Sequence, residues 1–420
     1  MKVDTIITDI KTLYTSQYNS LVKGDKMNNI SVIHNAFIAI KDGKIFDFGN
    51  HSFEDYLHED IDVHSAMNQI VIPGLIDSHT HLVHGGSREH EFDQKLSGVS
   101  YMDILKSGGG ILSTVEATKK ATKKELFDKA IKSLNQMLLF GVTSLEAKSG
   151  YGLDLETELK QLEVIRDCNL AHSIEIYPTY LGAHAFPPMF KENPDAFVDQ
   201  ILEDLDKVAS SKLAKYVDVF CEEGVFSLKQ TKRILEKAKT LGMSVRIHSD
   251  EMVSLGGTPL AVDFQAKSVD HLMAIKDEDI AYLAKSDTVA NVLPSTSFYL
   301  NKAYANGRKL IHEGCALSIA SDYNPGSTPS ENYQFAMQLG AIKMKLKPYE
   351  ILTAATINPA YSLEILDKVG TIQKGKQADL VIMNAPNLEY LFYHYGINHT
   401  KDVFKNGKCV VYNQVILEEK

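Results

Sequence analysis

Eight short apolar segments alternate with amphipathic, Lys/Glu-rich stretches through the middle of the chain, and this alternation constrains its fold most strongly. A strand-then-helix repeat predicts a parallel sheet covered by helices. Eight such strands favour a closed α/β barrel, the (β/α)8 or TIM barrel. An open doubly wound sheet is the alternative, but the first strand lacks a GxGxxG turn. The predicted strands are Ile70–Asp77, Val142–Ala147, Ile174–Leu181, Val217–Cys221, Ser244–His248, Val269–Leu272, Thr288–Leu293 and Ala316–Ala320.

Both ends of the chain instead show short strands with period-two alternation and turn signals such as Asp42-Gly43 and Asn406-Gly407. Neither end is long enough to bury a core alone. We therefore predict that residues 1–65 and 365–420 pair into one small β-sandwich domain. Residues 66–364 would form the barrel domain inserted between them.

Composition excludes several classes of function. The chain carries 44 basic and 54 acidic residues, a net charge of −10, which argues against a nucleic-acid partner. No apolar run approaches the ~20 residues that span a bilayer, and the first residues lack the apolar core of a signal peptide. The four cysteines form no CxxC pair, so neither a disulfide framework nor a cysteine-based zinc site is indicated. We expect a cytoplasmic protein that binds neither nucleic acid nor membrane.

Histidines and one aspartate follow four of the predicted strands. Functional side chains of such barrels lie at the C-terminal strand ends. The first strand is followed by His79 and His81, and their spacing on an extended strand directs both imidazoles to one side. The fifth strand ends in His248, the sixth carries His271, and the eighth ends near Asp322. A lone histidine is commonly structural, but the barrel would bring all five residues to one rim, which predicts a metal site.

The segment IPGLIDSHTH at 72–81, with His248, His271 and Asp322 in that order, resembles the metal-dependent amidohydrolase superfamily. The run KGKQADLVI near the C-terminus resembles the β-sandwich of the same superfamily, so the resemblance covers essentially the whole chain. It implies a hydrolase with a catalytic metal. Two-metal members carry a carboxylated lysine at the end of strand four, where this chain has Cys221–Gly224. Lys148 follows strand two, and we interpret it as a supporting residue.

The resemblance therefore implies one divalent ion held by His79, His81, His248 and Asp322. Zn2+ and Fe2+ both suit imidazole and carboxylate ligands, and the sequence does not choose between them. A water molecule on such an ion has a pKa near neutrality. Asp322 would be the general base that faces this water. Glu251 follows a ligand in an HxxE pattern and would transfer a proton to the leaving nitrogen, unless it is a solvated loop carboxylate. His271 would polarise the substrate carbonyl, orient the water or act as a fifth ligand.

Finer motifs resemble the imidazolonepropionase family, whose members open 4-imidazolone-5-propanoate to N-formimidoyl-L-glutamate in histidine degradation. These motifs are HGGSR with Glu91-Phe92, SGGGI at 107–111, EAKSGYG at 146–152, LGAH at 181–184 and DYNPGS at 322–327. The resemblance implies a small-molecule substrate whose carboxylate tail binds Arg88, as a guanidinium can hold a carboxylate with two hydrogen bonds. The other residues expected to bind substrate or opened product are Tyr151, His184, Glu251, Asn324, Gly326 and Ser327.

Other interpretations remain open at this point. The glycine run at 108–110 lacks the Lys-Ser/Thr of a phosphate-binding loop, and we interpret it as a flexible loop over the site or a simple hinge. A mononuclear deaminase acting on a cytosine- or guanine-like ring would share the metal-binding motifs but has less need of Arg88 and of the Asn324–Ser327 segment. A non-catalytic scaffold is a further alternative, although every ligand is present. By analogy with similar enzymes, we expect a homodimer.

Overall fold

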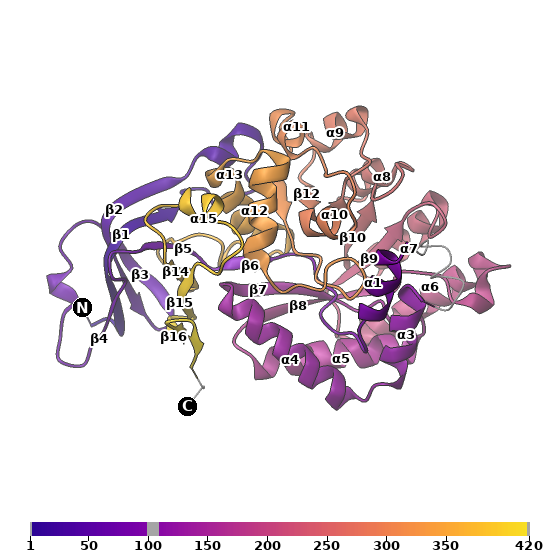
Figure 1. Ribbon diagram of the computed structural model, residues 1–420, viewed down its shortest axis with the longest axis horizontal. Coiled ribbons are helices and arrows are strands. Elements are labelled where there is room, and N and C mark those ends of the chain that lie inside the picture. Colours follow the sequence, from indigo (N-terminus) through magenta and orange to yellow (C-terminus); the bar gives the residue numbers. More distant parts are fainter. Residues whose placement is uncertain (1, 99–108, 418–420) are drawn as a thin grey trace.

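The computed structural model describes residues 2–98 and 109–417 and contains two sheets (Figure 1). In the eight-stranded sheet each strand pairs in parallel with the next one along the chain. All eight predicted barrel strands are present, so the predicted barrel is confirmed. Its strands are β6 (Leu75–Asp77), β7 (Val142–Lys148), β8 (Glu175–Ala183), β9 (Tyr216–Cys221), β10 (Ser244–Ser249), β11 (Ser268–His271), β12 (Val289–Val292) and β13 (Leu317–Ile319).

Backbone hydrogen bonds just beyond β6 and β13 join the first and last barrel strands. The N–H of Asp322 donates to the carbonyl of His79 at 3.1 Å, and the N–H of His81 donates to the carbonyl of Tyr323 at 2.8 Å. Closure of the barrel thus brings the residues after the first strand against those after the eighth. This is how the fold unites segments about 240 positions apart in the sequence.

Helices surround the barrel (Figure 1). In α4 the buried residues Leu126, Ala130 and Leu134 recur at helical spacing, and a Thr122–Glu125 capping box begins the helix. No helix in the described part of the chain is long and apolar enough to cross a membrane. The helices are α1 (Glu89–Leu96), α3 (Ile111–Lys120), α4 (Lys123–Leu139), α5 (Leu155–Ala171), α6 (Pro194–Ser211), α7 (Leu228–Thr240), α8 (Gly257–Asp263), α9 (Asp277–Leu283), α10 (Pro294–Tyr299), α11 (Gly307–His312), α12 (Tyr333–Met344), α13 (Pro348–Ala355), α14 (Ile357–Ser362) and α15 (Tyr390–Tyr393).

The second sheet is built from both ends of the chain, in the order β17-β16-β15-β14-β5-β1-β2-β3, with β4 beside β1. Because β14 pairs with β5, and β5 with β1, a C-terminal strand continues the N-terminal sheet. The predicted shared β-domain is confirmed, and its boundaries at 65/66 and 364/365 stay a prediction. The strands are β1 (Thr5–Thr15), β2 (Ser31–Lys41), β3 (Lys44–Gly49), β4 (Asp62–Ser65), β5 (Ile70–Pro73), β14 (Leu380–Met383), β15 (Thr400–Lys405), β16 (Lys408–Tyr412) and β17 (Val415–Ile416).

The predicted strand Ile70–Asp77 is divided between the two sheets. Its first part is β5 of the terminal sheet, its last part is β6 of the barrel, and Gly74 lies between them. A Cβ at Gly74 would lie only 2.2 Å from Oγ1 of Thr143 on the neighbouring β7. Glycine therefore allows the chain to pass from one sheet to the other at close packing distance.

Gly74→Ala is accordingly expected to destabilise the protein by about 2 kcal/mol, the usual range for overpacking a buried site. The thermal unfolding midpoint, followed by circular dichroism, should fall by several degrees. Thr143→Ala removes both the hydroxyl and the methyl that a new Cβ would meet first. The double variant should therefore recover part of the loss, and an unchanged midpoint in Gly74→Ala would contradict this account of the crossing.

Candidate active site

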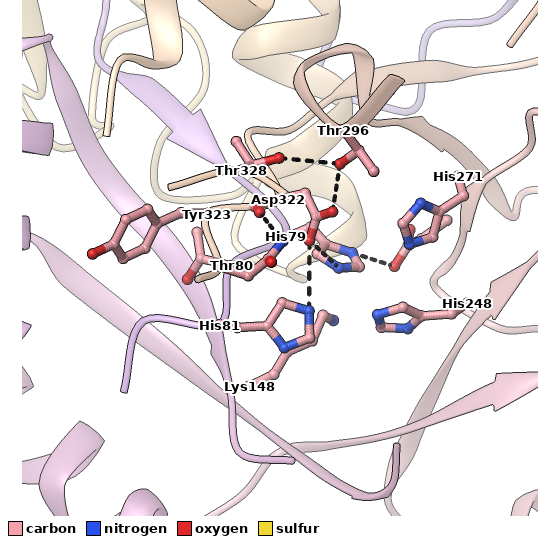
Figure 2. A network of polar contacts seen from close by, with 12 residues as sticks. His79, Thr80, His81, Lys148, His248, His271, Thr296, Asp322, Tyr323 and Thr328 are labelled. Atoms are coloured by element: carbon pink, nitrogen blue, oxygen red, sulfur yellow. Dashed lines mark hydrogen bonds and ion pairs between the residues drawn. The ribbon is translucent and has the colours of Figure 1, made fainter. Parts of the chain in front are cut away.

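Three histidines and an aspartate converge at the C-terminal rim of the barrel (Figure 2). His79 and His81 follow β6, His248 lies in β10, and Asp322 follows β13. Ring nitrogens from the three histidines lie within 4.8 Å of one another. Oδ1 of Asp322 lies 3.5 Å from Nε2 of His79 and 3.5 Å from Nε2 of His81. The structure thus brings together all four residues predicted to bind the metal.

The chemistry of these side chains fits a divalent metal ion. Nε2 of His79 and Nε2 of His248 are buried, and neither has a hydrogen-bond partner among the described residues. Burying a polar atom without a hydrogen-bond partner is unfavourable. A bound ion between the two rings would give both nitrogens a partner. Imidazole nitrogen and carboxylate oxygen are the donors that catalytic zinc sites use. The four side chains can therefore hold a metal.

Buried carboxylates contact two of these histidines at the ring nitrogen Nδ1. Nδ1 of His79 lies 3.0 Å from Oδ2 of Asp270 on β11, and Nδ1 of His248 lies 3.1 Å from Oδ2 of Asp218 on β9. A carboxylate at one ring nitrogen fixes the imidazole so that the other nitrogen faces the metal. Neither aspartate was predicted from the sequence. The available signal was a single acidic residue inside a short buried strand.

Asp322 presents its two carboxylate oxygens to different partners. Oδ1 faces His79 and His81, whereas Oδ2 accepts a hydrogen bond from Oγ1 of Thr296 on α10. Burial raises the pKa of Asp322 above its ordinary value. Asp322 also has a backbone φ of 56°, which is uncommon for a residue other than glycine. This arrangement places a buried carboxylate with a raised pKa next to the three histidines.

Glu251 and His271 lie beside the histidine cluster. Oε2 of Glu251 is 3.6 Å from Nε2 of His271, whose ring centroid is 5.3 Å from that of His248. Glu251 is largely buried rather than a solvated loop residue, and its side chain is 17% exposed. Burial raises the pKa of Glu251 to about 7 and lowers that of His271 to about 3. A carboxyl group with such a pKa can give or take a proton near neutral pH.

Glu222 anchors the loop that carries Glu251, a role that the sequence did not indicate. Its carboxylate accepts hydrogen bonds from the backbone N–H groups of Glu251 at 3.1 Å, Met252 at 3.0 Å and Val253 at 3.0 Å. Glu222 itself is buried and directly follows β9. Its carboxylate therefore sets the position of the Glu251 backbone relative to His248.

Tyr151 and His184 come from the ends of neighbouring strands and lie next to His81. The ring of His184 stacks on that of His81 at a centroid distance of 5.0 Å and an interplanar angle of 15°. The ring of Tyr151 lies 5.7 Å from His81 and 5.3 Å from His184. Both residues therefore border the histidine cluster, as expected for groups that contact a ligand there.

Arg88 is held in place by Glu91. Its Nε and Nη2 donate to Oε2 of Glu91 at 3.0 and 2.7 Å, and Oε1 of Glu91 accepts the N–H of Gly110 at 2.8 Å. A Cβ at Gly326 would lie 2.4 Å from Nη1 of Arg88, so this glycine leaves room for the guanidinium. Residues 107 and 108 of the predicted glycine loop lie outside the described residues.

The segment 324–327 links Arg88 to Asp322. The side chain of Asn324 accepts the N–H groups of Gly326 and Ser327, both at 2.8 Å, and donates to the carbonyl of Asp322 at 2.6 Å. Arg88 and Asn324 line a cavity of about 400 Å³. Asn324 thus connects Asp322 with the segment that lies against Arg88.

Arg88→Met is expected to raise KM about 10–100-fold for a substrate with a carboxylate tail, because a charge-assisted hydrogen bond contributes about 1.5–3 kcal/mol. Steady-state kinetics would measure the change, and kcat should change less. Arg166 is exposed and pairs with Asp167 at 2.7 Å, so Arg166→Met is a suitable control with unchanged kinetics. An unaltered KM in Arg88→Met would remove this residue from substrate binding.

Comparison with known proteins finds a matching family and several similar chains. Residues 70–410 match the amidohydrolase family. The chain is 49% identical to the imidazolonepropionase of Alkaliphilus metalliredigens and 47% identical to that of Fusobacterium nucleatum, each over 98% of this chain and 99% of the relative. A zinc-bound adenosine deaminase from Xanthomonas campestris has a similar fold, with a TM-score of 0.74 at 17% identity over 100% of this chain and 95% of that one. E. coli guanine deaminase also has a similar fold, with a TM-score of 0.70 at 14% identity over 97% of this chain and 99% of that one.

Proposed function

The chain belongs to the amidohydrolase family, and from this premise we propose that it hydrolyses the ring amide bond of 4-imidazolone-5-propanoate to give N-formimidoyl-L-glutamate in histidine degradation. Relatives called imidazolonepropionase, 49% and 47% identical over nearly the full length, support this substrate. The observation that carries the proposal is the position of Arg88, which segment 324–327 links to Asp322 beside the histidine cluster. A small ring with an anionic tail suits this arrangement.

We propose that the site holds one divalent ion, Zn2+ or Fe2+, through His79, His81, His248 and Asp322. When bound, such an ion activates water and polarises a carbonyl. Nε2 of His79 and Nε2 of His248 are buried without a hydrogen-bond partner among the described residues, and this supports the ion. The donor set suits both metals, and metal analysis of the purified protein decides between them.

Several side chains of the protein then bind the substrate and transfer protons during hydrolysis. Arg88 binds the propionate tail, and Tyr151 and His184 border the ring. Asp322 takes a proton from the attacking water, whose oxygen bonds to the ring carbonyl carbon. His271, kept neutral by burial, donates a hydrogen bond to the carbonyl oxygen. Glu251 gives a proton to the ring nitrogen as the carbon–nitrogen bond breaks, so the product carries a new carboxylate and an N–H group.

Freshly generated imidazolone propionate, which is unstable, tests the proposal directly. The purified protein should remove its ultraviolet absorbance while formimidoylglutamate appears, and a chelator-treated sample should not. If the metal-loaded protein fails to turn the compound over, the substrate assignment is wrong. Ammonia release from cytosine- or guanine-like rings would then support the deaminase alternative.

The proposals on the cellular location, oligomeric state and partners of the protein rest on its composition and on similar enzymes. We propose that the protein works in the cytoplasm as a homodimer, acting on a small molecule and on neither nucleic acid nor membrane. Its net charge of −10 supports the exclusion of nucleic acid. Light scattering on the purified protein gives its mass in solution and thus tests the dimer.

A further inference from the structure

One buried lysine lies behind the histidine cluster. Lys148 is the last residue of β7, its side chain is fully buried, and Figure 2 shows it extending towards the space between His81 and His248. Its Nζ donates to Oε1 of Glu146 at 2.8 Å and to Oδ2 of Asp218 at 2.7 Å. Burial alone would lower the pKa of Lys148, but the carboxylates of Asp218 and Glu146 outweigh this effect and raise the pKa. Two buried carboxylates within hydrogen-bond distance of Nζ favour the ammonium form of this side chain.

Each carboxylate that Lys148 binds also contacts a segment that carries predicted metal ligands. Oδ2 of Asp218 accepts from Lys148 and also lies 3.1 Å from Nδ1 of His248. Oε2 of Glu146 accepts the backbone N–H of Thr80 at 3.3 Å, and the carbonyl of Glu146 accepts from Oγ1 of Thr80 at 2.7 Å. Thr80 is the residue between His79 and His81. Contacts from one ammonium group thus reach the two segments that supply all three histidines.

We propose that Lys148 is a positioning residue for the metal centre, whose ammonium group fixes Glu146 and Asp218 so that the three imidazoles face one point. The proposal rests on the proposed metal-dependent function. Removing one member of a buried ion pair leaves an uncompensated charge and loosens whatever that charge holds. Without Lys148, Asp218 and Glu146 would each lose a buried partner of opposite charge.

If Lys148 acted only through its charge, removing it would change the metal affinity in the opposite direction to a loss of positioning. Removing a positive charge near a metal cation reduces repulsion, which by itself strengthens metal binding. Loss of orientation instead weakens it, because residues that hold metal ligands in place typically contribute about 10–100-fold to affinity. The direction of the change therefore distinguishes positioning from charge.

The test is the affinity of the metal-free protein for Zn2+, measured by competition with a chromophoric chelator. Lys148→Met is expected to bind Zn2+ about 10–100-fold more weakly. The visible spectrum of the Co2+-loaded variant should also differ from that of the wild type, because the ligand geometry changes. Lys148→Met/Glu146→Gln removes one positive and one negative charge, which keeps the net buried charge and favours folding. It should show the same loss.

Lys405 provides a matched control in the other sheet. It is buried on β15 and its Nζ lies 2.6 Å from Oδ2 of Asp379, so Lys405→Met should lower thermal stability without changing Zn2+ affinity. Unchanged or tighter Zn2+ binding by a folded Lys148 variant would overturn the proposal. If neither variant folds, Asp218→Asn decides in the same assay, and unchanged affinity there overturns it too. Normal metal binding without turnover by the wild type would contradict only the proposed substrate.

Discussion

Replacing Asp322 with Asn is expected to lower kcat about 10³-fold, the scale of a lost general base. Asparagine has nearly the same shape and can still accept the hydrogen bond from Thr296 through its side-chain oxygen. It cannot take up a proton from water. Turnover of imidazolone propionate should be measured together with the bound metal of each preparation, because Asp322 is also expected to bind the ion.

Thr296→Val separates the proton-transfer role of Asp322 from its positioning. This change removes the hydrogen bond to Oδ2 of Asp322 but leaves the carboxylate in place. One such bond to a charged group contributes about 1.5–3 kcal/mol, so kcat should fall about 10–100-fold, less than in Asp322→Asn. Full kcat in Asp322→Asn with metal still bound would refute the general-base assignment.

The barrel was predictable because both of its signals are local. Each strand is a short apolar run, and each helix has one apolar face, as in α4. The division of Ile70–Asp77 was not predictable, because all its residues are buried in one sheet or the other and an apolar run does not specify which. Only the close approach of Gly74 to Thr143, a contact between two strands, places the crossing.

The convergence of the three histidines and Asp322 was predictable because barrel geometry places strand ends on one rim. The residues that hold these side chains in place could not be predicted from the sequence. Asp218 and Asp270 are single acidic residues inside short buried strands, and no spacing relates them to His248 or His79. Glu222 acts on a loop that follows a different strand. Lys148 was interpreted as a supporting residue, and its contacts with Glu146 and Asp218 agree with this interpretation.

Glu251→Gln is expected to lower kcat by about 10²–10³-fold through loss of the proton donor to the leaving nitrogen. Burial raises the pKa of Glu251 to about 7, so the protonated, donating form is present below that pH and is lost as the pH rises through it. The kcat of the wild type should therefore decline above about pH 7, and this decline should be absent in Glu251→Gln. Glu223 is an exposed neighbour of Glu222, and Glu223→Gln should leave both kcat and its pH profile unchanged.

The pH profile distinguishes Glu251 from the other candidate for protonating the nitrogen. Asp322 also lies in the site, and burial raises its pKa as well, so a loss of kcat alone would not identify the donor. If Glu251→Gln keeps its metal and retains the decline above pH 7, Glu251 is not the donor. The proton would then come from Asp322 after it has accepted one from water. If the decline disappears while Asp322→Asn retains it, two carboxyl groups share the reaction, one accepting a proton and the other donating one.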